Sequence, residues 1–234
     1  MKIITLTLNP AFDVHCHFSS FKAESENFGT VTSKDAGGKG INISRALLSN
    51  EIQSLPLVSL GYENGSEFVS ILEKDGLKCE FFSVPGRIRE NYTLHTEGSD
   101  ETRISFDGTI RDAELLKKCE TFINSHRDAD TAVTFTGSIP SCVSKQECKE
   151  MLKRLRTAGV KTVIDCRSFS LEDVTECRPF LIKPNKLELS SMLGHDISEI
   201  SEVISAVRNL QTMQKSAVSE PSEKGWIHLS VLHL

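Results

Sequence analysis

The stretch TAVTFTGSIPSCVSKQECKEMLKRLRTAGVKTVID, residues 131–165, decides the fold. Residues 131–136 have the composition of a buried strand, residues 144–158 have the apolar spacing of a helix, and residues 160–165 form the next strand. A strand, a crossover helix and a second strand make a βαβ unit, whose two strands lie parallel in one sheet. This stretch therefore predicts a parallel sheet covered by helices.

The same alternation of strands and helices continues on both sides of this unit. We expect further strands at residues 3–8, 55–60, 78–84, 180–183 and 227–231. We expect further helices at residues 41–49, 67–75 and 112–125, after residue 183 through residue 193, and at residues 198–213, followed by a loop at residues 215–225. The pattern predicts an α/β fold with a mostly parallel central sheet.

Two segments interrupt this alternation, residues 13–33 and residues 91–106. Both segments are polar, and within them polar residues alternate with residues that favour strands, such as Tyr92 and Ile104. We expect them to form antiparallel strands that stand off the main sheet. The pattern predicts a small β lid over an α/β core.

Composition excludes several classes of protein. The 234 residues contain 27 Lys and Arg against 32 Asp and Glu, so the net charge is −5 rather than the basic excess of a nucleic-acid binder. No apolar run approaches the roughly 20 residues that a membrane helix needs. The seven cysteines form no CxxC pair, which favours reduced, packed thiols over a zinc site or disulfides. We expect a cytoplasmic protein that binds neither nucleic acid nor membranes.

A glycine-rich loop, AGGKG at residues 36–40, precedes the helix expected at residues 41–49. Glycines let backbone N–H groups approach a ligand closely, and the start of a helix favours negative charge. The loop matches neither GxxxxGK(S/T) nor GxGxxG, so a generic nucleotide-binding loop is excluded. We expect the loop to contact a ligand, and a plain tight turn into the helix is the alternative.

Polar side chains follow several predicted strands, at the edge where open α/β sheets hold ligands. Asp13 comes just after the first strand and its Asn-Pro turn, and it could accept hydrogen bonds from sugar hydroxyls. Ser138, in the segment TGSIP, follows the strand at residues 131–136, and Asp165 ends the next strand. These residues are candidates for a binding site, although an aspartate after a turn can also be a simple cap.

The segment KPNKLEL, residues 183–189, follows the strand expected at residues 180–183. Pro184 can open a helix, which places Asn185 and Glu188 about one turn apart on one face. Oxygen ligands at this spacing suit Mg²⁺ in company with phosphate. Glu188 can equally be the third residue of the helix, where a carboxylate stabilises the helix start, and the two roles can coexist.

Taken together, these motifs resemble one family. TLNP with Asp13, AGGKG followed by Asn42, TGSIP, IDC and KPNxxEL occur in the order found in the ribokinase-like, PfkB-type carbohydrate kinases. Within that family the chain resembles the group of 1-phosphofructokinases, 6-phosphofructokinases and tagatose-6-phosphate kinases. The resemblance implies a ribokinase-like three-layer sandwich with a β lid, here as a single incomplete domain over residues 1–234 that lacks the C-terminal part.

The resemblance also implies an activity and a site. Members transfer a phosphoryl group from ATP, with Mg²⁺, to a hydroxyl of a phosphorylated ketohexose, and they commonly form homodimers through the lid. The residues implied to bind the sugar phosphate are Asp13, Gly37, Gly38, Lys39, Asn42, Arg89, Asn91, Arg103 and Ser138. Those implied to lie at the ATP phosphates are Lys183, Asn185 and Glu188, with Asn185 and Glu188 at Mg²⁺. Arg89 and Arg103 are implied to face the substrate phosphate, which the planar fork of arginine contacts at two points.

The chain departs from the family pattern toward its C-terminus. Members carry a glycine-containing nucleotide loop and then a Gly-Ala-Gly-Asp segment whose aspartate is the general base, and the 234 residues contain no GxGD. We therefore assign no catalytic base, interpret Asp165 as a structural residue near the nucleotide, and expect impaired phosphoryl transfer in a truncated chain. The alternatives are a non-catalytic sugar-phosphate binder or regulator, and a remnant without function. The preferred ketohexose phosphate stays open.

Overall fold

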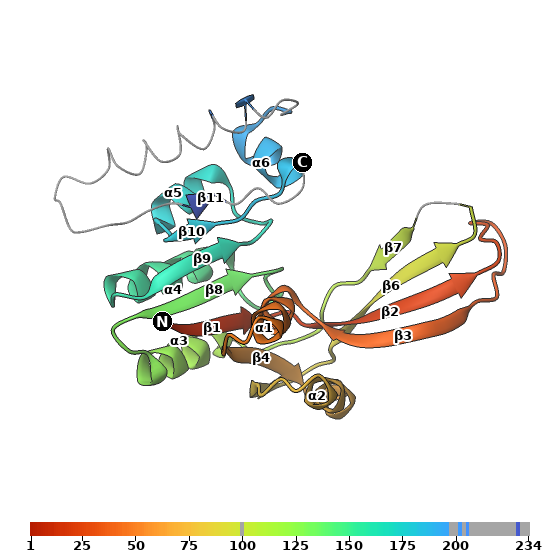
Figure 1. Ribbon diagram of the computed structural model, residues 1–234, viewed down its shortest axis with the longest axis horizontal. Coiled ribbons are helices and arrows are strands. Elements are labelled where there is room, and N and C mark those ends of the chain that lie inside the picture. Colours follow the sequence, from red (N-terminus) through yellow and green to blue (C-terminus); the bar gives the residue numbers. More distant parts are fainter. Residues whose placement is uncertain (99–100, 197–200, 203–204, 206–227, 230–234) are drawn as a thin grey trace.

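The larger of two sheets forms the centre of the molecule (Figure 1). The computed structural model describes residues 1–98, 101–196, 201–202, 205 and 228–229. Within them the sheet has the order β11-β10-β9-β8-β1-β4-β5, and all neighbouring strands are parallel. Its strands are β1 (Lys2–Thr7), β4 (Leu55–Gly61), β5 (Glu80–Val84), β8 (Thr131–Thr136), β9 (Lys161–Asp165), β10 (Leu181–Ile182) and β11 (His228–Leu229). The predicted α/β fold with a mostly parallel sheet is confirmed.

Alternation along β1 explains how the central strand serves both faces of the sheet. Ile4 and Leu6 are fully buried in the larger apolar cluster, whereas Thr5 between them points to the opposite face. There the Thr5 hydroxyl lies 2.8 Å from the hydroxyl of Ser44 on α1 (Lys39–Ser49). A buried hydroxyl pair thus fixes α1 against the middle of the sheet.

Helices form a layer on each face of the sheet (Figure 1). The remaining helices are α2 (Gly65–Lys74), α3 (Leu115–His126), α4 (Lys145–Thr157), α5 (Leu171–Cys177) and α6 (Lys186–Leu193). Buried residues of α1 and α2 belong to one apolar cluster, and those of α3, α4 and α5 belong to the other. The sheet therefore separates two cores, as in a three-layer α/β sandwich. In the described part of the chain, every helix is too short or too polar to cross a membrane.

A second sheet of four strands extends away from the central sheet as a lid (Figure 1). Its order is β3-β2-β6-β7. Its strands are β2 (Ala11–Phe18), β3 (Thr30–Gly37), β6 (Arg89–Thr96) and β7 (Thr102–Ser105). At the base of the lid Phe12 packs edge to face on Phe68 of α2, with ring centroids 5.2 Å apart. One face of the lid therefore continues the apolar cluster of α1 and α2.

The lid differs from the expected antiparallel arrangement at its centre. The outer pairs β2–β3 and β6–β7 are antiparallel, but β2 and β6 are parallel, with Asp13 opposite Asn91. The expectation is wrong for this pair because β2 follows β1 and β6 follows β5, and these two parallel strands end at the same edge of the central sheet. The chain therefore enters the lid twice in the same direction.

Helix α5 has no counterpart among the expected elements. It has seven residues and begins with a capping box, in which the Ser170 hydroxyl accepts from the backbone N–H of Asp173 and the Asp173 carboxylate accepts from that of Ser170. Serine followed three residues later by an acidic residue resembles the sequence signal of a helix start, so this pattern could have predicted the helix.

Parts of four expected elements lie outside the described residues, and one of these parts is residues 99–100 of the lid segment expected at residues 91–106. The loop expected at residues 215–225 lies wholly outside them, and of the helix expected at residues 198–213 only residues 201–202 and 205 are described, all three as helical. Of the strand expected at residues 227–231, residues 228–229 are described and form β11, which pairs with β10.

Candidate functional site

Four neighbouring strands of the central sheet, β10, β9, β8 and β1, carry polar residues at the edge where they end. These residues are Lys183 after β10, Asp165 at the end of β9, Ser138 after β8 and Asn9 after β1. The carboxyl ends of parallel strands are where open α/β sheets bind ligands. This edge is therefore the candidate site.

Lys39, Asp165, Lys183 and Glu188 form a charged group at this edge, which we call the lysine–carboxylate cluster. Lys39 Nζ lies 2.7 Å from Asp165 Oδ1 and 3.7 Å from Glu188 Oε1. Lys183 Nζ lies 3.8 Å from Asp165 Oδ2. The Asp165 side chain is 8% exposed, whereas those of Lys39 and Lys183 are 43% and 42% exposed. A buried carboxylate thus anchors two ammonium groups that still face solvent.

The N-terminal cap of α6 brings Glu188 to this cluster. Asn185 Oδ1 accepts a hydrogen bond from the backbone N–H of Glu188 at 2.8 Å, and Glu188 Oε2 accepts from the backbone N–H of Asn185 at 3.0 Å. This reciprocal arrangement is a capping box, so the interpretation of Glu188 as a carboxylate that stabilises the helix start is confirmed. The other carboxylate oxygen, Oε1, faces Lys39.

Asn9, Arg89, Phe106 and Ser138 form a second group where the lid meets the central sheet, which we call the hinge cluster. Asn9 Nδ2 donates to Ser138 Oγ at 2.9 Å, and Arg89 Nη2 donates to the same oxygen at 3.4 Å. Arg89 Nη1 donates to the backbone carbonyl of Phe106 at 3.0 Å. A pocket of about 290 Å³ is lined by Arg89 and Phe106, among other residues. Arg89 therefore joins the lid to the sheet.

Asp13 and Asn91 lie opposite each other on β2 and β6. Asn91 Nδ2 donates to Asp13 Oδ1 at 3.0 Å. Gly37 makes room for this carboxylate, because a Cβ at Gly37 would overlap Asp13 Oδ2. Gly38 has a φ of 137°, a conformation that glycine adopts readily and other residues do not. Gly37 and Gly38 therefore allow the Asp13 carboxylate and the start of α1 to lie close together.

The surroundings of Arg89 affect its charge. Burial lowers the pKa of the half-buried Arg89 guanidinium, and the carboxylates of Asp13 and Asp107 oppose that shift. The group stays cationic at neutral pH because the ordinary pKa of arginine lies far above 7. A partly desolvated cation attracts an anion more strongly than an exposed cation does. The lid therefore contributes a positioned positive charge to the hinge cluster.

The two clusters are neighbours in space. Gly137, next to Ser138, donates its backbone N–H to the carbonyl of Asp165 at 3.0 Å. A Cβ built on Gly137 would lie 3.7 Å from Lys39 Cβ. The segment after β8 therefore adjoins the hinge cluster through Ser138 and the lysine–carboxylate cluster through Gly137.

Two predicted site residues contact neither cluster. Asn42 is exposed, and its Oδ1 accepts from Arg45 Nη1 at 2.9 Å. The Arg103 side chain is 75% exposed and its guanidinium lies 3.1 Å from a carboxylate oxygen of Glu101. Among the hydrogen bonds and ion pairs of the described residues, none joins Asn42 or Arg103 to the clusters. Their roles in binding stay predictions.

The structure adds Asn9 to the residues predicted from the sequence. It also shows that Asp165 contacts both lysines of the lysine–carboxylate cluster. The argument that selects Ser138 also selects Asp165, since both stand at the end of a buried strand on the ligand-binding edge. Asn9 also follows a predicted strand, but the sequence indicates only a turn there, because an Asn-Pro pair is typical of any turn.

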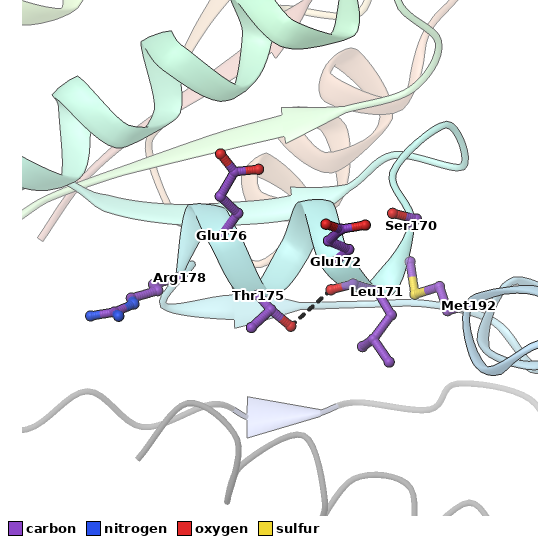
Figure 2. A pocket seen from close by; sticks show the side chains of 7 residues that line it. All are labelled: Ser170, Leu171, Glu172, Thr175, Glu176, Arg178 and Met192. Carbon is purple, nitrogen blue, oxygen red and sulfur yellow. Dashed lines mark hydrogen bonds between the residues drawn. The ribbon is translucent and has the colours of Figure 1, made fainter. Parts of the chain in front are cut away.

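A larger pocket of about 740 Å³ lies along α5 (Figure 2). It is lined by Ser170, Leu171, Glu172, Thr175, Glu176, Arg178 and Met192. Two carboxylates and two apolar side chains stand in this lining, and none of its residues belongs to either cluster. It is therefore not the candidate site for an anionic ligand.

Comparison with known proteins identifies relatives of most of the chain. Residues 12–225 match the pfkB family carbohydrate kinase. The chain is 34% identical over 203 residues to the 1-phosphofructokinase of Bacillus subtilis (strain 168), and the match covers 86% of this chain and 66% of that protein. It is 27% identical over 209 residues to the 1-phosphofructokinase of Haemophilus influenzae, covering 89% and 67% of the two chains. The chain thus spans about two thirds of the length of these relatives.

Solved structures show the same fold. The crystal structure of phosphofructokinase-2 from Escherichia coli in complex with fructose-6-phosphate matches with a TM-score of 0.84 at 21% identity, over 92% of this chain and 71% of that chain. The predicted ribokinase-like sandwich is confirmed by this likeness, over the part that the chain spans. Since the family match also covers most of the sequence, this chain belongs to the pfkB family of carbohydrate kinases.

Proposed function

We propose that this chain binds a phosphorylated ketohexose at the hinge cluster and serves the transfer of a phosphoryl group from ATP to one of its hydroxyls. The observation that carries the proposal is Arg89, a half-buried cation held by two uncharged oxygens, those of Ser138 and Phe106. Because no carboxylate of the described residues forms a hydrogen bond with it, its charge is available to a phosphate. Asp13 lies on β2, two residue pairs along the β2–β6 ladder from the pair that contains Arg89. Its carboxylate can accept hydrogen bonds from sugar hydroxyls.

The lysine–carboxylate cluster fits the phosphates and metal of Mg²⁺-ATP. Lys39 and Lys183 are partly exposed donors, and Glu188 Oε1 is a hard oxygen ligand close to Lys39. Mg²⁺ keeps several waters and is held by one or two carboxylates together with substrate phosphates, so Glu188 and Asp165 would hold it and Asn185 would orient Glu188 through the cap. When bound, ATP supplies the phosphoryl group and Mg²⁺ neutralises charge on it.

Calorimetric titration without nucleotide tests the binding step. We propose fructose 1-phosphate as the first ligand, because the two curated relatives are named 1-phosphofructokinases, followed by fructose 6-phosphate and unphosphorylated fructose. We expect a ketohexose phosphate to bind at least about tenfold more tightly than fructose, since hydrogen bonds to charged groups contribute about 1.5–3 kcal/mol each. Arg89→Met should remove this preference, and Arg127→Met, at the far end of α3, should retain it. If no ketohexose phosphate binds, the proposal is wrong.

An assay of ADP release separates the kinase from a non-catalytic binder. Release that requires both ATP and the phosphosugar supports transfer, whereas phosphosugar binding without release supports the alternative of a binder or regulator. Impaired transfer stays a prediction, because the family base and nucleotide loop are not among residues 1–234. A cytoplasmic location stays a prediction as well.

We further propose that two copies of the chain pair through the lid. Five of the nine large apolar side chains that are exposed in the described part of the chain lie on the lid or at its edges. They are Phe21, Phe28, Val31, Ile104 and Phe106. Exposed apolar side chains gathered on one part of a surface mark interfaces, so the lid is the favoured contact between two copies.

Sedimentation velocity tests this pairing. We expect a dimer for the unmodified chain and a monomer for the double variant Val31→Lys/Ile104→Lys, because two buried ammonium groups would each cost several kcal/mol at an interface. Ile52→Lys, which changes an exposed isoleucine outside the lid, is the matched control and should stay dimeric. A monomeric unmodified chain at micromolar concentration would contradict the proposal.

A further inference from the structure

The Ser138 hydroxyl receives two donors and has one hydrogen left to give. Asn9 Nδ2 donates to Ser138 Oγ at 2.9 Å, and Arg89 Nη2 donates to it at 3.4 Å. A serine hydroxyl offers two acceptor lone pairs and one O–H donor. Two approaching N–H groups occupy the lone pairs, so the Ser138 hydrogen has to point away from both. The side chain is exposed, and no acceptor for this hydrogen is described among the structured residues.

Both side chains that donate to this hydroxyl carry a further polar atom without a partner in the described part of the chain. Five buried side-chain nitrogen or oxygen atoms of the described residues have no hydrogen-bond partner. Three of the five are Asn9 Oδ1, Arg89 Nε and Asn91 Oδ1, from the hinge cluster and its neighbour on β6. Buried polar atoms in folded proteins nearly always have a partner. Unused hydrogen-bonding capacity concentrated at one place therefore indicates a site built to receive a polar ligand.

Asn9 controls which way the Ser138 hydroxyl points. Without the amide of Asn9, a lone pair of Ser138 would be free, and the hydroxyl could turn to donate to a local acceptor or to water. Asn9 is held in place because it lies two residues after the end of β1 and precedes Pro10, whose ring fixes the local backbone. Strands β1 and β8 are direct neighbours in the sheet, so the short Asn9 side chain reaches Ser138 across one strand spacing.

We infer that Asn9 is a positioning residue for the substrate phosphate, because it fixes the Ser138 hydroxyl as a donor aimed, beside Arg89, at a phosphate oxygen. The inference rests on the proposed function, since it concerns the same ligand. It adds a residue that makes no contact with the phosphate itself and acts through Ser138. An anionic oxygen needs donors, and a hydroxyl locked as a donor costs no reorientation when the phosphate arrives.

A double-mutant cycle measured by calorimetry tests the inference. The ligand is the ketohexose phosphate that binds the unmodified chain, and the variants are Asn9→Leu, Ser138→Ala and the pair together. Asn9→Leu should weaken binding about five- to tenfold, the effect of one hydrogen bond. In the Ser138→Ala background the same change should have less than about a twofold effect, because coupled residues are not additive. Asn124→Leu, an exposed asparagine on α3, should bind as the unmodified chain does.

An isosteric variant covers the case in which Asn9→Leu fails to fold. Asn9→Asp keeps the shape of the side chain, but its carboxylate cannot donate to Ser138, accepts the hydroxyl hydrogen instead, and adds a negative charge near the phosphate. We expect it to weaken phosphosugar binding at least about tenfold while leaving the melting temperature within a few degrees. Phosphosugar binding equal to that of the unmodified chain would overturn the inference.

The possible results separate the inference from the proposed function. If the unmodified chain binds no ketohexose phosphate, the proposed function fails and the inference fails with it. If the unmodified chain binds and Asn9→Leu binds equally well, only the inference fails. If Asn9→Leu weakens binding equally with and without the Ser138 hydroxyl, Asn9 acts on structure rather than through Ser138, and the inference is again wrong.

Discussion

Gly38 shows how much of the site depends on a single backbone conformation. It lies between the end of β3 and the start of α1, directly before Lys39, with a φ of 137°. Its missing side chain also leaves room for Thr7, whose Cγ2 would lie 2.5 Å from a Cβ at Gly38. The lid, the helix start and the lysine–carboxylate cluster therefore meet at a position that only glycine suits.

Gly38→Ala should destabilise the chain by about 1–3 kcal/mol, from backbone strain and the clash with Thr7. It should also weaken phosphosugar binding, because Gly38 directly follows Gly37, which packs against the Asp13 carboxylate, so a shift of this turn would move Asp13. Urea unfolding and calorimetry measure the two effects. Gly76→Ala is the matched control, since Gly76 has a φ of 73° but nothing within 4 Å of a Cβ, and it should leave binding unchanged. Normal binding by Gly38→Ala would contradict this account.

Lys39→Met tests the balance of charge around Asp165. Among the ion pairs of the described residues, the buried Asp165 carboxylate would lose its partner at 2.7 Å and keep Lys183 at 3.8 Å. We expect a loss of roughly 1–2 kcal/mol in the free energy of unfolding, less than for a fully buried pair because Lys39 is partly exposed. Adding Asp165→Asn should restore much of that loss. Lys117→Met, which removes an exposed partner of Glu114, should change nothing measurable.

The residues of the site were predictable where a strand end or a glycine loop marked them. Asp13, Lys39, Ser138 and Glu188 all carry such marks in the sequence, and the structure places them at one edge. Asn9 also follows a predicted strand, but its role could not be predicted, because that role arises from a contact with a residue 129 positions away. Side-chain pairing across such a separation is set by the folded sheet and leaves no local pattern.

At the scale of elements, caps decide where the short helices begin. Helix α5 has seven residues and starts with the capping box of Ser170 and Asp173. Lys145 and Lys149 of α4 contact the Asp173 carboxylate at 2.7 Å and 3.0 Å. The Asp173 side chain is 7% exposed. Asp173 therefore joins the start of α5 to α4, and a short apolar pattern alone could not have predicted this helix.

Asp173→Asn should destabilise the chain in a pH-dependent way. Burial alone would raise the pKa of Asp173, but hydrogen bonds from Lys145, Ser170 and Lys149 outweigh it and hold that pKa below its ordinary value. The stabilisation is therefore complete above the unfolded pKa of about 3.9 and is lost as the pH falls through the lower folded pKa. We expect a cost of roughly 2 kcal/mol at pH 7. The thermal unfolding temperatures of the two proteins should begin to converge as the pH falls below about 4; a constant difference down to strongly acidic pH would contradict this.

The lid shows which element-level features follow from a simple rule. Its strands were expected from polar alternation, and the parallel pairing of β2 with β6 follows from the direction of β1 and β5. That direction is known only once the order of the central sheet is known. Pairing between distant segments is thus a property of topology, which composition and periodicity do not carry.

At the scale of the whole molecule, two apolar cores pack on opposite faces of one sheet. Five of the seven cysteines are buried and none forms a disulfide, in agreement with the expectation of reduced, packed thiols. They are small apolar parts of the cores, with Cys119 and Cys148 in the larger cluster and Cys16 in the smaller. Reaction of these thiols therefore reports on opening of the cores.

Thiol labelling of the native protein should be slow and selective. Burial raises the pKa of Cys119 and of Cys148 to about 12, and that of the partly exposed Cys79 to about 11, so few thiolates exist at pH 7.5. We expect Cys142 to react first with iodoacetamide, then Cys79, and Cys119 and Cys148 only at the rate of unfolding. Peptide mass spectrometry identifies each site. Rapid labelling of Cys148 under native conditions would contradict the packing described for α4.

Arg89 is the side chain that spans the joint between lid and sheet, with one nitrogen on the chain leaving the lid at Phe106 and another on Ser138. A phosphate that binds this guanidinium, as proposed, would compete with Ser138 or Phe106 for the same N–H groups. Occupancy of the site and attachment of the lid are therefore expected to depend on each other through this one side chain.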